Sequence, residues 1–158
     1  MKFLDEIEIG EREVLGSYRF EQDDIIAFAR KYDPQPFHLD PEAAKRTHFG
    51  ALVASGWQTA AVWMKLFVAF NERHVAERIA SGLPVPELGP SPGFRKMRWL
   101  KPVYAGDTLT YATEARSKAN SKSRPQFGML SAYNSATNQD GALVFDFESM
   151  VFLQRQPA

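Results

Sequence analysis

The chain has 158 residues, of which 44% are hydrophobic and 24% charged, an ordinary globular composition. We therefore predict one folded domain over residues 1–158. Lys plus Arg (19) balance Asp plus Glu (19), so the chain lacks the positive excess that favours nucleic-acid or anionic membrane partners, and we expect neither. The absence of cysteine excludes disulfides, thiol nucleophiles and thiolate metal sites.

No segment has the pattern of a targeting signal or a membrane span. Residues 1–8 are rich in acidic side chains and lack the apolar run of a secretory signal. The most apolar stretch, residues 57–70, is shorter than the roughly 18 residues that indicate a membrane span, and it contains Lys65. We therefore expect a cytoplasmic protein.

The first half of the chain is predicted to be mostly helical. After a short strand at residues 13–20, apolar side chains recur with helical spacing over residues 25–32. Pro34 ends this helix, because proline disfavours the helical conformation at the residue before it. Asp40 followed by Pro41 predicts the start of a second, short helix.

The third predicted helix begins at Ser55 and is the most apolar element of the chain. Ser55 is a typical N-cap residue, and Gln58 three positions later completes the pattern of a capping box. Residues 59–70 are apolar on nearly every side of the helix, which predicts that it is buried on most of its faces. Another element must therefore enclose it.

The second half of the chain is predicted to supply that enclosure as a set of strands. Apolar and polar side chains alternate along residues 94–100, 108–115, 127–133 and 144–153, with turns at Gly106-Asp107 and Asp140-Gly141. Successive strands joined by turns form antiparallel sheets, so the predicted class is α+β. A strand meander after a buried helix is typical of the hot-dog fold, an antiparallel sheet wrapped around a central helix.

Several common chemistries have no support in the sequence. The glycines form neither a dinucleotide-binding nor a phosphate-binding loop, and Ser55 does not lie in a nucleophile elbow. The histidines lack the spacing of a zinc hydrolase. His38 and Asp40, with Asp33 nearby, are a conceivable metal site, but such pairs are common by chance, so we expect no metal.

The segment from Asp33 to His38 is the first candidate for a functional site. Asp33 follows a helix C-terminus, where the helix dipole disfavours a carboxylate. Pro34 and Pro36 restrict the backbone between Asp33 and His38. A carboxylate and an imidazole held together can position and activate a water molecule. The alternative is a proline-rich loop with a solvated aspartate and a surface histidine.

The predicted helix start at Ser55-Gly56 is the second candidate. If Ser55 caps the N–H of Gln58, the N–H groups of Gly56 and Trp57 are left without helical partners. Such donors can bind a carbonyl oxygen that gains negative charge, and glycine lets a ligand approach closely. The alternative is an ordinary capped helix with a small residue for packing.

These segments resemble the hydratase motif of the MaoC-like dehydratases, the (R)-specific enoyl-CoA hydratase group. The similarity is carried by residues 32–44, by Phe49-Gly50 and Ala54-Ser55-Gly56, and by residues 99–109. The resemblance implies a homodimer, or a dimer of dimers, of hot-dog subunits that binds an acyl-CoA in a tunnel at the subunit interface. Members add water to a trans-2-enoyl-CoA, or run the reverse dehydration, without a metal or redox cofactor.

The resemblance also implies roles for individual residues. Asp33 and His38 would hold and activate the water as catalytic residues, and the Gly56 N–H would bind the thioester oxygen beside Ser55. Gln35 and Phe37 stand where better-known members carry asparagine and a smaller aliphatic residue, and both are expected to contact substrate.

The basic residues near position 96, the segment 71–92 and the function itself each have an alternative interpretation. Arg95, Lys96 and Arg98 are either CoA-phosphate ligands or, as we favour, surface charges, and residues 71–92 could cover the site. A hot-dog thioesterase and a non-catalytic acyl-CoA-binding subunit are the alternative functions.

Overall fold

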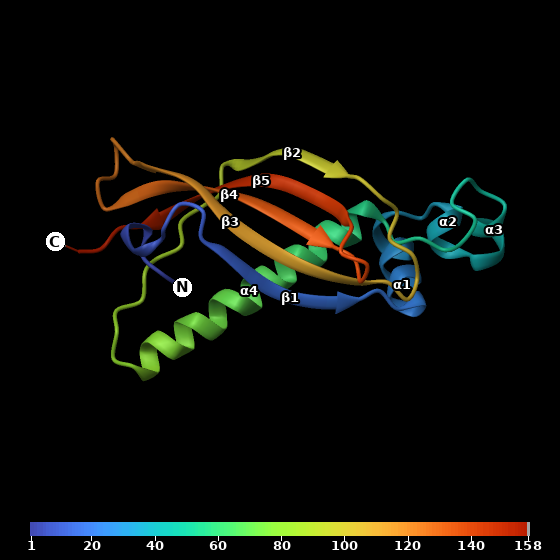
Figure 1. Ribbon diagram of the computed structural model, residues 1–158, viewed down its shortest axis with the longest axis horizontal. Coiled ribbons are helices and arrows are strands. Elements are labelled where there is room, and N and C mark those ends of the chain that lie inside the picture. Colours follow the sequence, from blue (N-terminus) through green and yellow to red (C-terminus); the bar gives the residue numbers. More distant parts are fainter. Residues whose placement is uncertain (158) are drawn as a thin grey trace.

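The computed structural model describes residues 1–157. Its elements in chain order are η1 (Leu4–Glu6), β1 (Arg12–Arg19), α1 (Gln22–Tyr32), α2 (Pro36–Leu39), α3 (Pro41–Lys45), α4 (Gly56–Ala80), β2 (Gly93–Trp99), β3 (Thr108–Asn120), β4 (Phe127–Thr137) and β5 (Leu143–Gln154). The strands form one antiparallel sheet in the order β1-β3-β4-β5-β2. The long helix α4 runs across one face of this sheet (Figure 1). This arrangement confirms the predicted α+β class and hot-dog fold.

The core lies between the N-terminal half of α4 and the sheet. Val62 and Trp63 of α4 are buried in the same cluster as Tyr111 of β3 and Phe145 of β5. The Tyr111 hydroxyl donates a hydrogen bond of 3.1 Å to the carbonyl oxygen of Thr59, which ties the sheet to the helix backbone. Each large apolar side chain buried here contributes about 1.5–3 kcal/mol, so this cluster holds α4 in place on the sheet.

The opposite face of α4 is not covered. Trp57, Met64 and Val68 are spaced by seven and then four positions and therefore share one side of the helix, and they are 56%, 52% and 45% exposed. The prediction that α4 is buried on most of its faces is therefore wrong for the single chain. The sheet covers only the side that carries Val62 and Trp63, because a helix can place only one stripe of side chains against one sheet.

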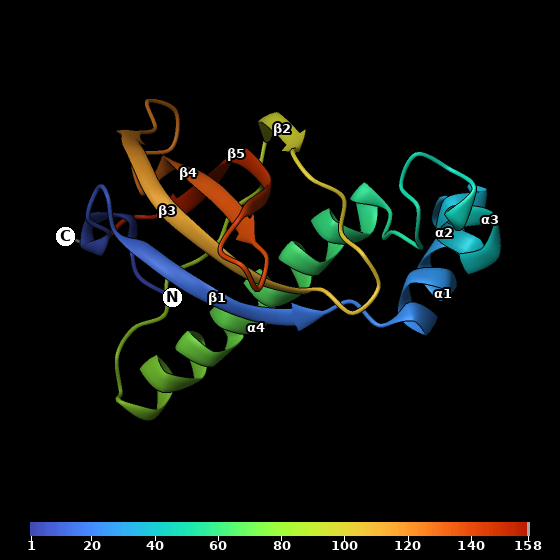
Figure 2. The ribbon, with the colours of Figure 1, turned by 45° about the vertical axis from the view of Figure 1, so that its right-hand side comes forward.

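Helices α1, α2 and α3 lie beyond the N-terminal end of α4 (Figures 1 and 2). The predicted helix before Pro34 is α1, and the predicted start at Asp40 is α3, where the Asp40 carboxylate accepts a hydrogen bond of 2.8 Å from the Glu42 N–H. Helix α2 was not predicted, because residues 34–38 were interpreted only as a proline-restricted connection or, alternatively, as a loop. Pro36 is its first residue, a position where proline needs no N–H partner.

The segment after α4 lies at the opposite end of the molecule from α1, α2 and α3 (Figure 1). Helix α4 continues to Ala80, and Leu88 then forms an isolated bridge with Leu153 near the end of β5. Within residues 1–157, no helix is both long enough and apolar enough to span a membrane.

Candidate active site

Asp33 and His38 are placed by two consecutive helices. Asp33 is the C-cap of α1, where its N–H donates to the Ala29 carbonyl at 2.9 Å, and His38 lies on α2. His38 Nδ1 lies 2.7 Å from the Val53 carbonyl oxygen, so Nδ1 carries a proton and donates it to that carbonyl. This contact fixes the ring, and the remaining nitrogen, Nε2, lies 3.3 Å from Asp33 Oδ2.

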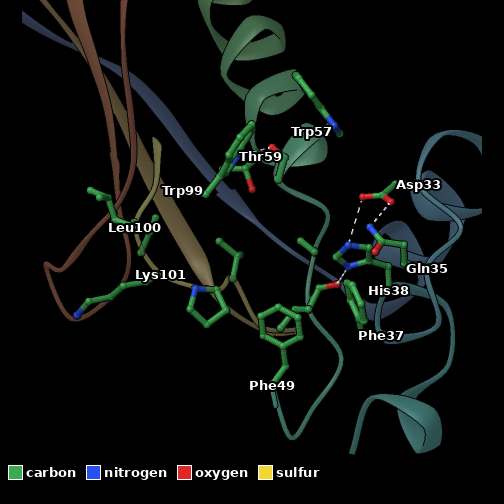
Figure 3. Close-up of a pocket in the computed structure, with 16 residues that line it drawn as sticks. Asp33, Gln35, Phe37, His38, Phe49, Trp57, Thr59, Trp99, Leu100 and Lys101 are labelled. Carbon is green, nitrogen blue, oxygen red and sulfur yellow. Dashed lines mark hydrogen bonds and ion pairs between the residues drawn. The ribbon is translucent and has the colours of Figure 1, made fainter. Parts of the chain in front are cut away.

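The Asp33 carboxylate has donors on both oxygens. The Ser55 hydroxyl donates to Oδ2 at 2.6 Å, and the Gln35 side-chain amide donates to Oδ1 at 2.7 Å. Figure 3 shows the Gln35 and His38 contacts around this carboxylate. These hydrogen bonds offset the unfavourable position of a carboxylate at a helix C-terminus.

The same contacts decide the charge of Asp33. Burial by itself raises the pKa of this carboxyl, but hydrogen bonds from Ser55 and Gln35 and the neighbouring His38 outweigh it, and the pKa lies below its usual range. Asp33 is therefore ionised at neutral pH, beside a histidine whose side chain is only 7% exposed. A carboxylate and an imidazole in this arrangement can bind a water molecule between them and accept its proton.

Ser55 caps α4, but not through the predicted contact. Its hydroxyl oxygen accepts a hydrogen bond of 3.2 Å from the Trp57 N–H, while its proton goes to Asp33. The Gln58 N–H donates instead to the Ser55 carbonyl oxygen at 3.0 Å, and Gln58 Oε1 is buried without a hydrogen-bond partner among the described residues 1–157. The predicted capping box with Gln58 is therefore wrong, because the hydroxyl is oriented by a carboxylate from another element.

Gly56 is required by the packing of Trp99. A Cβ atom at position 56 would lie 2.6 Å from Trp99 Nε1, and the Trp99 indole N–H donates to the Gly56 carbonyl at 2.9 Å. The Gly56 N–H is in the first turn of α4, where backbone N–H groups have no helical partner. Sequence reasoning explained this glycine by ligand approach or, alternatively, by packing, but it did not identify Trp99, which lies 43 positions away, as the neighbour.

A cavity of about 400 Å³ brings these groups together. The α1–α2 region, the first turn of α4, the end of β2 and Val144 at the start of β5 form its walls (Figure 3). Five of the six predicted site residues line it, and Ser55 is fully buried behind Asp33. The five are Asp33, Gln35, Phe37, His38 and Gly56.

Phe37 packs into the wall of this cavity. Its ring lies 4.5 Å from the His38 ring and 5.1 Å from the Phe49 ring, measured between centroids. Phe37 therefore supports His38 from the side as well as lining the cavity. Phe49 belongs to the segment that carries the family resemblance, but no role was assigned to it from the sequence, and it lines the cavity.

The basic residues of β2 do not line this cavity. Lys96 Nζ lies 2.8 Å from Glu148, and the Arg98 guanidinium donates to Asp146 at 2.9 Å. These contacts match the interpretation as ion-paired surface charges. Lys101, which sequence reasoning missed, lines the cavity instead. No residue of 71–92 contributes to the lining in the single chain, so this segment does not cover the site there.

The fold is that of the hot-dog proteins, and comparison with known families agrees. The model of the MaoC-like domain matches residues 7–137. The chain belongs to the MaoC-like domain family.

Relatives of the chain support this assignment over its length. An uncharacterized protein of Bacillus subtilis (strain 168), YdeM, is 33% identical over 152 residues, covering 96% of this chain and 99% of the relative. The crystal structure of a MaoC-like dehydratase from Rhodospirillum rubrum is 35% identical with a TM-score of 0.82, and each chain covers 100% of the other. An unliganded R-hydratase, PhaJ1 from Pseudomonas aeruginosa, shares the fold at 24% identity and a TM-score of 0.67, covering 98% of this chain and 86% of the other.

Proposed function

We propose that this protein is a hydro-lyase that adds water to the double bond of an enoyl-CoA-type acyl thioester, or removes it in the reverse direction. The observation that carries the proposal is the Asp33 carboxylate, held by Ser55 and Gln35 at 3.3 Å from His38 Nε2 in the wall of a cavity. The similarity of the chain to a MaoC-like dehydratase and to an (R)-hydratase supports the same reaction class.

In the proposed hydration, Asp33 and His38 bind one water molecule between them. Because His38 Nδ1 donates to Val53, the neutral ring has its lone pair on Nε2 and can accept a proton from that water. The water oxygen bonds to C3 of the substrate, and the electrons of the double bond move towards C2 and the thioester oxygen. The proton held by His38 then adds to C2, so H and OH are added overall and both side chains return to their starting state.

The thioester oxygen gains negative charge during this step and needs a donor. The Gly56 N–H at the start of α4 is the proposed donor, because a helix N-terminus offers unpaired N–H groups and a favourable dipole. Only protons move between the chain and the substrate, so the reaction requires neither a metal nor a redox cofactor. We place the protein in the cytoplasm and its substrate in fatty acid metabolism.

We also propose that the protein is a homodimer, or a dimer of dimers. The exposed stripe of α4 (Trp57, Met64 and Val68) lies near β2, an edge strand that carries the exposed Phe94. A second copy of the chain that pairs with this edge strand would bury both the strand and the apolar helix face beside it. Trp57 lines the cavity, so a partner seated on this stripe would cover one side of the site.

The direct test is the ultraviolet absorbance of crotonyl-CoA, followed together with thiol release. Hydration predicts loss of the conjugated-enoyl signal with no free thiol, and Asp33→Asn should lower the rate by about 10²- to 10⁴-fold. Thiol release by the wild-type protein would instead identify a thioesterase. Unchanged absorbance with crotonyl-CoA and with longer and branched enoyl-CoAs, despite measurable binding, would identify a non-catalytic acyl-CoA-binding protein.

A further inference from the structure

The indole of Trp99 contacts the first turn of α4 at the wall of the candidate site. Trp99 is the last residue of β2, and its indole N–H donates a hydrogen bond of 2.9 Å to the Gly56 carbonyl oxygen. Its ring also meets the Trp57 ring edge to face, with centroids 5.4 Å apart. Trp99 lines the cavity, but the proposed reaction assigns it no role.

The residue before Trp99 holds this end of β2 on the sheet. The Arg98 guanidinium binds both carboxylate oxygens of Asp146, at 2.9 Å and 2.5 Å. Asp146 is 1% exposed, and the Tyr133 hydroxyl also donates to it at 2.9 Å. Bidentate contacts between charged groups fix the geometry of the groups that make them. Trp99 therefore approaches α4 from a strand end that is held in place.

One peptide group connects the Trp99 indole with Ser55. The carbonyl of Gly56 and the N–H of Trp57 belong to the same planar peptide group. The carbonyl accepts the Trp99 indole N–H, and the N–H donates to the Ser55 hydroxyl oxygen at 3.2 Å. The Ser55 hydroxyl in turn donates to Asp33 Oδ2 at 2.6 Å. A series of hydrogen bonds therefore runs in one direction from Trp99 to Asp33.

Hydrogen bonds in such a series strengthen one another. A peptide group that accepts at its oxygen is a stronger donor at its N–H, and a hydroxyl that accepts this N–H is a stronger donor itself, by about 10–30% per bond. The series ends on Asp33 Oδ2, which is also the oxygen that lies 3.3 Å from His38 Nε2. The Trp99 indole therefore acts on the carboxylate oxygen that would hold the water.

Few charges compete with this series at Asp33. His38, on α2, is the titratable side chain that contacts the carboxylate among residues 1–157. The first turn of α4 carries only uncharged side chains. Three basic side chains of the surrounding elements have no ion pair with this carboxylate in the described part of the chain, namely Arg30, Lys31 and Lys101.

We propose that Trp99 is a positioning residue for Asp33, and that its indole N–H orients the Ser55 hydroxyl towards the carboxylate through the peptide group of Gly56 and Trp57. This inference rests on the proposed function only for the catalytic role of Asp33. Loss of the indole N–H weakens the Ser55 hydroxyl as a donor, so the ionised carboxylate is less well stabilised and its pKa rises.

The test replaces the Trp99 indole by rings that cannot donate. Trp99→Phe removes the N–H with part of the ring. A tryptophan analogue with sulfur in place of the indole N–H, incorporated at position 99 by stop-codon suppression, removes the N–H and keeps the shape, so the test stays decisive if Trp99→Phe does not fold. Trp63→Phe is the matched control, because the Trp63 indole N–H is buried without a hydrogen-bond partner among residues 1–157. Thermal unfolding followed by circular dichroism shows which variants are folded.

Both changes at Trp99 should move the acidic limb of the pH profile of kcat/KM for crotonyl-CoA to higher pH, by about 0.2–0.5 pH units. Trp63→Phe should leave the limb in place. In the Ser55→Ala protein, Trp99→Phe should move the limb no further, because the series is already interrupted at Ser55. A lower unfolding temperature with an unmoved limb, or an equal shift in the Ser55→Ala protein, would overturn the proposal.

Carbon-13 NMR separates this inference from the proposed function. The resonance of the Asp33 carboxyl carbon, assigned by its loss in Asp33→Asn, reports the pKa of this group with no substrate present. A pKa of Asp33 that rises in both Trp99 variants supports the series even if no enoyl-CoA is hydrated, and only the catalytic role of Asp33 then falls. Conversely, hydration by the wild-type protein, with an Asp33 pKa that neither Trp99 variant changes, removes the role of Trp99 and leaves the hydratase proposal intact.

Discussion

The Ser55 hydroxyl donates a hydrogen bond of 2.6 Å to Asp33 Oδ2, which joins the first turn of α4 to the last turn of α1. The same hydroxyl oxygen accepts the Trp57 N–H, so one side chain caps the central helix and orients the candidate base. Stability and catalysis are therefore coupled at Ser55, and its replacement should affect both.

Ser55→Ala is expected to lower kcat for crotonyl-CoA by about ten- to a hundredfold, because a hydrogen bond to a charged group contributes about 1.5–3 kcal/mol. Loss of the cap should also lower the free energy of unfolding by about 1 kcal/mol. Steady-state kinetics and urea unfolding measure the two effects. Ser55→Thr keeps the hydroxyl and should recover most of the activity; wild-type kcat in Ser55→Ala would contradict the assigned role.

Gln35→Ala should shift the acidic limb of the pH profile of kcat/KM to higher pH. The Gln35 amide stabilises the ionised carboxylate of Asp33, so its removal raises the pKa of Asp33 towards its usual range. Activity then begins to fall at a higher pH as the pH is lowered, because the protonated carboxyl cannot orient water. Gln139→Ala, which changes an amide bound to Asp107 instead, is the control. An unchanged acidic limb in Gln35→Ala would exclude Asp33 as its source.

The same lowered pKa has a consequence for stability. A carboxyl whose pKa is depressed in the folded state stabilises the protein above its unfolded pKa, about 3.9, and loses that contribution as the pH falls through the lower folded value. The difference in unfolding free energy between the wild-type protein and Asp33→Asn should therefore shrink below about pH 4. Urea unfolding of both proteins from pH 7 to pH 3 measures it. A difference that grows as the pH falls would have the opposite sign to this prediction.

Gly56→Ala should destabilise the protein through Trp99. The added methyl group would lie within 2.9 Å of three indole atoms, and overpacking of this kind costs about 1–3 kcal/mol. Trp99→Ala removes the clash, so the double variant should be more stable than the sum of the two single effects predicts. A double-mutant cycle by urea unfolding measures this coupling, and additive effects would show that Trp99 does not determine the residue at position 56.

Met64→Glu should convert a dimer into a monomer. The Met64 side chain is 52% exposed in the single chain, so a charge there is tolerated in the monomer but opposed in an apolar interface. Light scattering at micromolar concentration measures the mass. Glu77→Gln, at the polar end of α4, is the control. A monomeric wild-type protein would contradict the proposed assembly.

The local features were predictable because they depend on residues close together in the chain. The cap at Asp40, the helix before Pro34 and the alternating strands follow from side-chain spacing and backbone preference, which operate over a few residues. Helix α2 was missed for a local reason as well. Pro36 was interpreted only as restricting the backbone, although, like Pro41, it suits the first turn of a helix.

The errors at α4 have a different cause. The capping contact of Ser55 depends on Asp33, which lies 22 positions earlier, and the exposed side of α4 depends on the width of the sheet that covers it. Gly56 is determined by an indole 43 positions later. The pattern of residues within one segment does not predict these contacts between segments.

The sequence by itself determined the α+β class, the order of the elements and the residues of the candidate site. Hydrophobic spacing, turn residues and a compact motif each depend on residues that are close together in the chain, so they can be recognised without the structure. Only the tertiary structure decided how those residues act on one another. The hydrogen bond from Ser55 to Asp33, the contact of Trp99 with Gly56 and the packing of Trp63 against Phe147 all join distant segments. Packing, which depends on the whole fold at once, sets each of these distances.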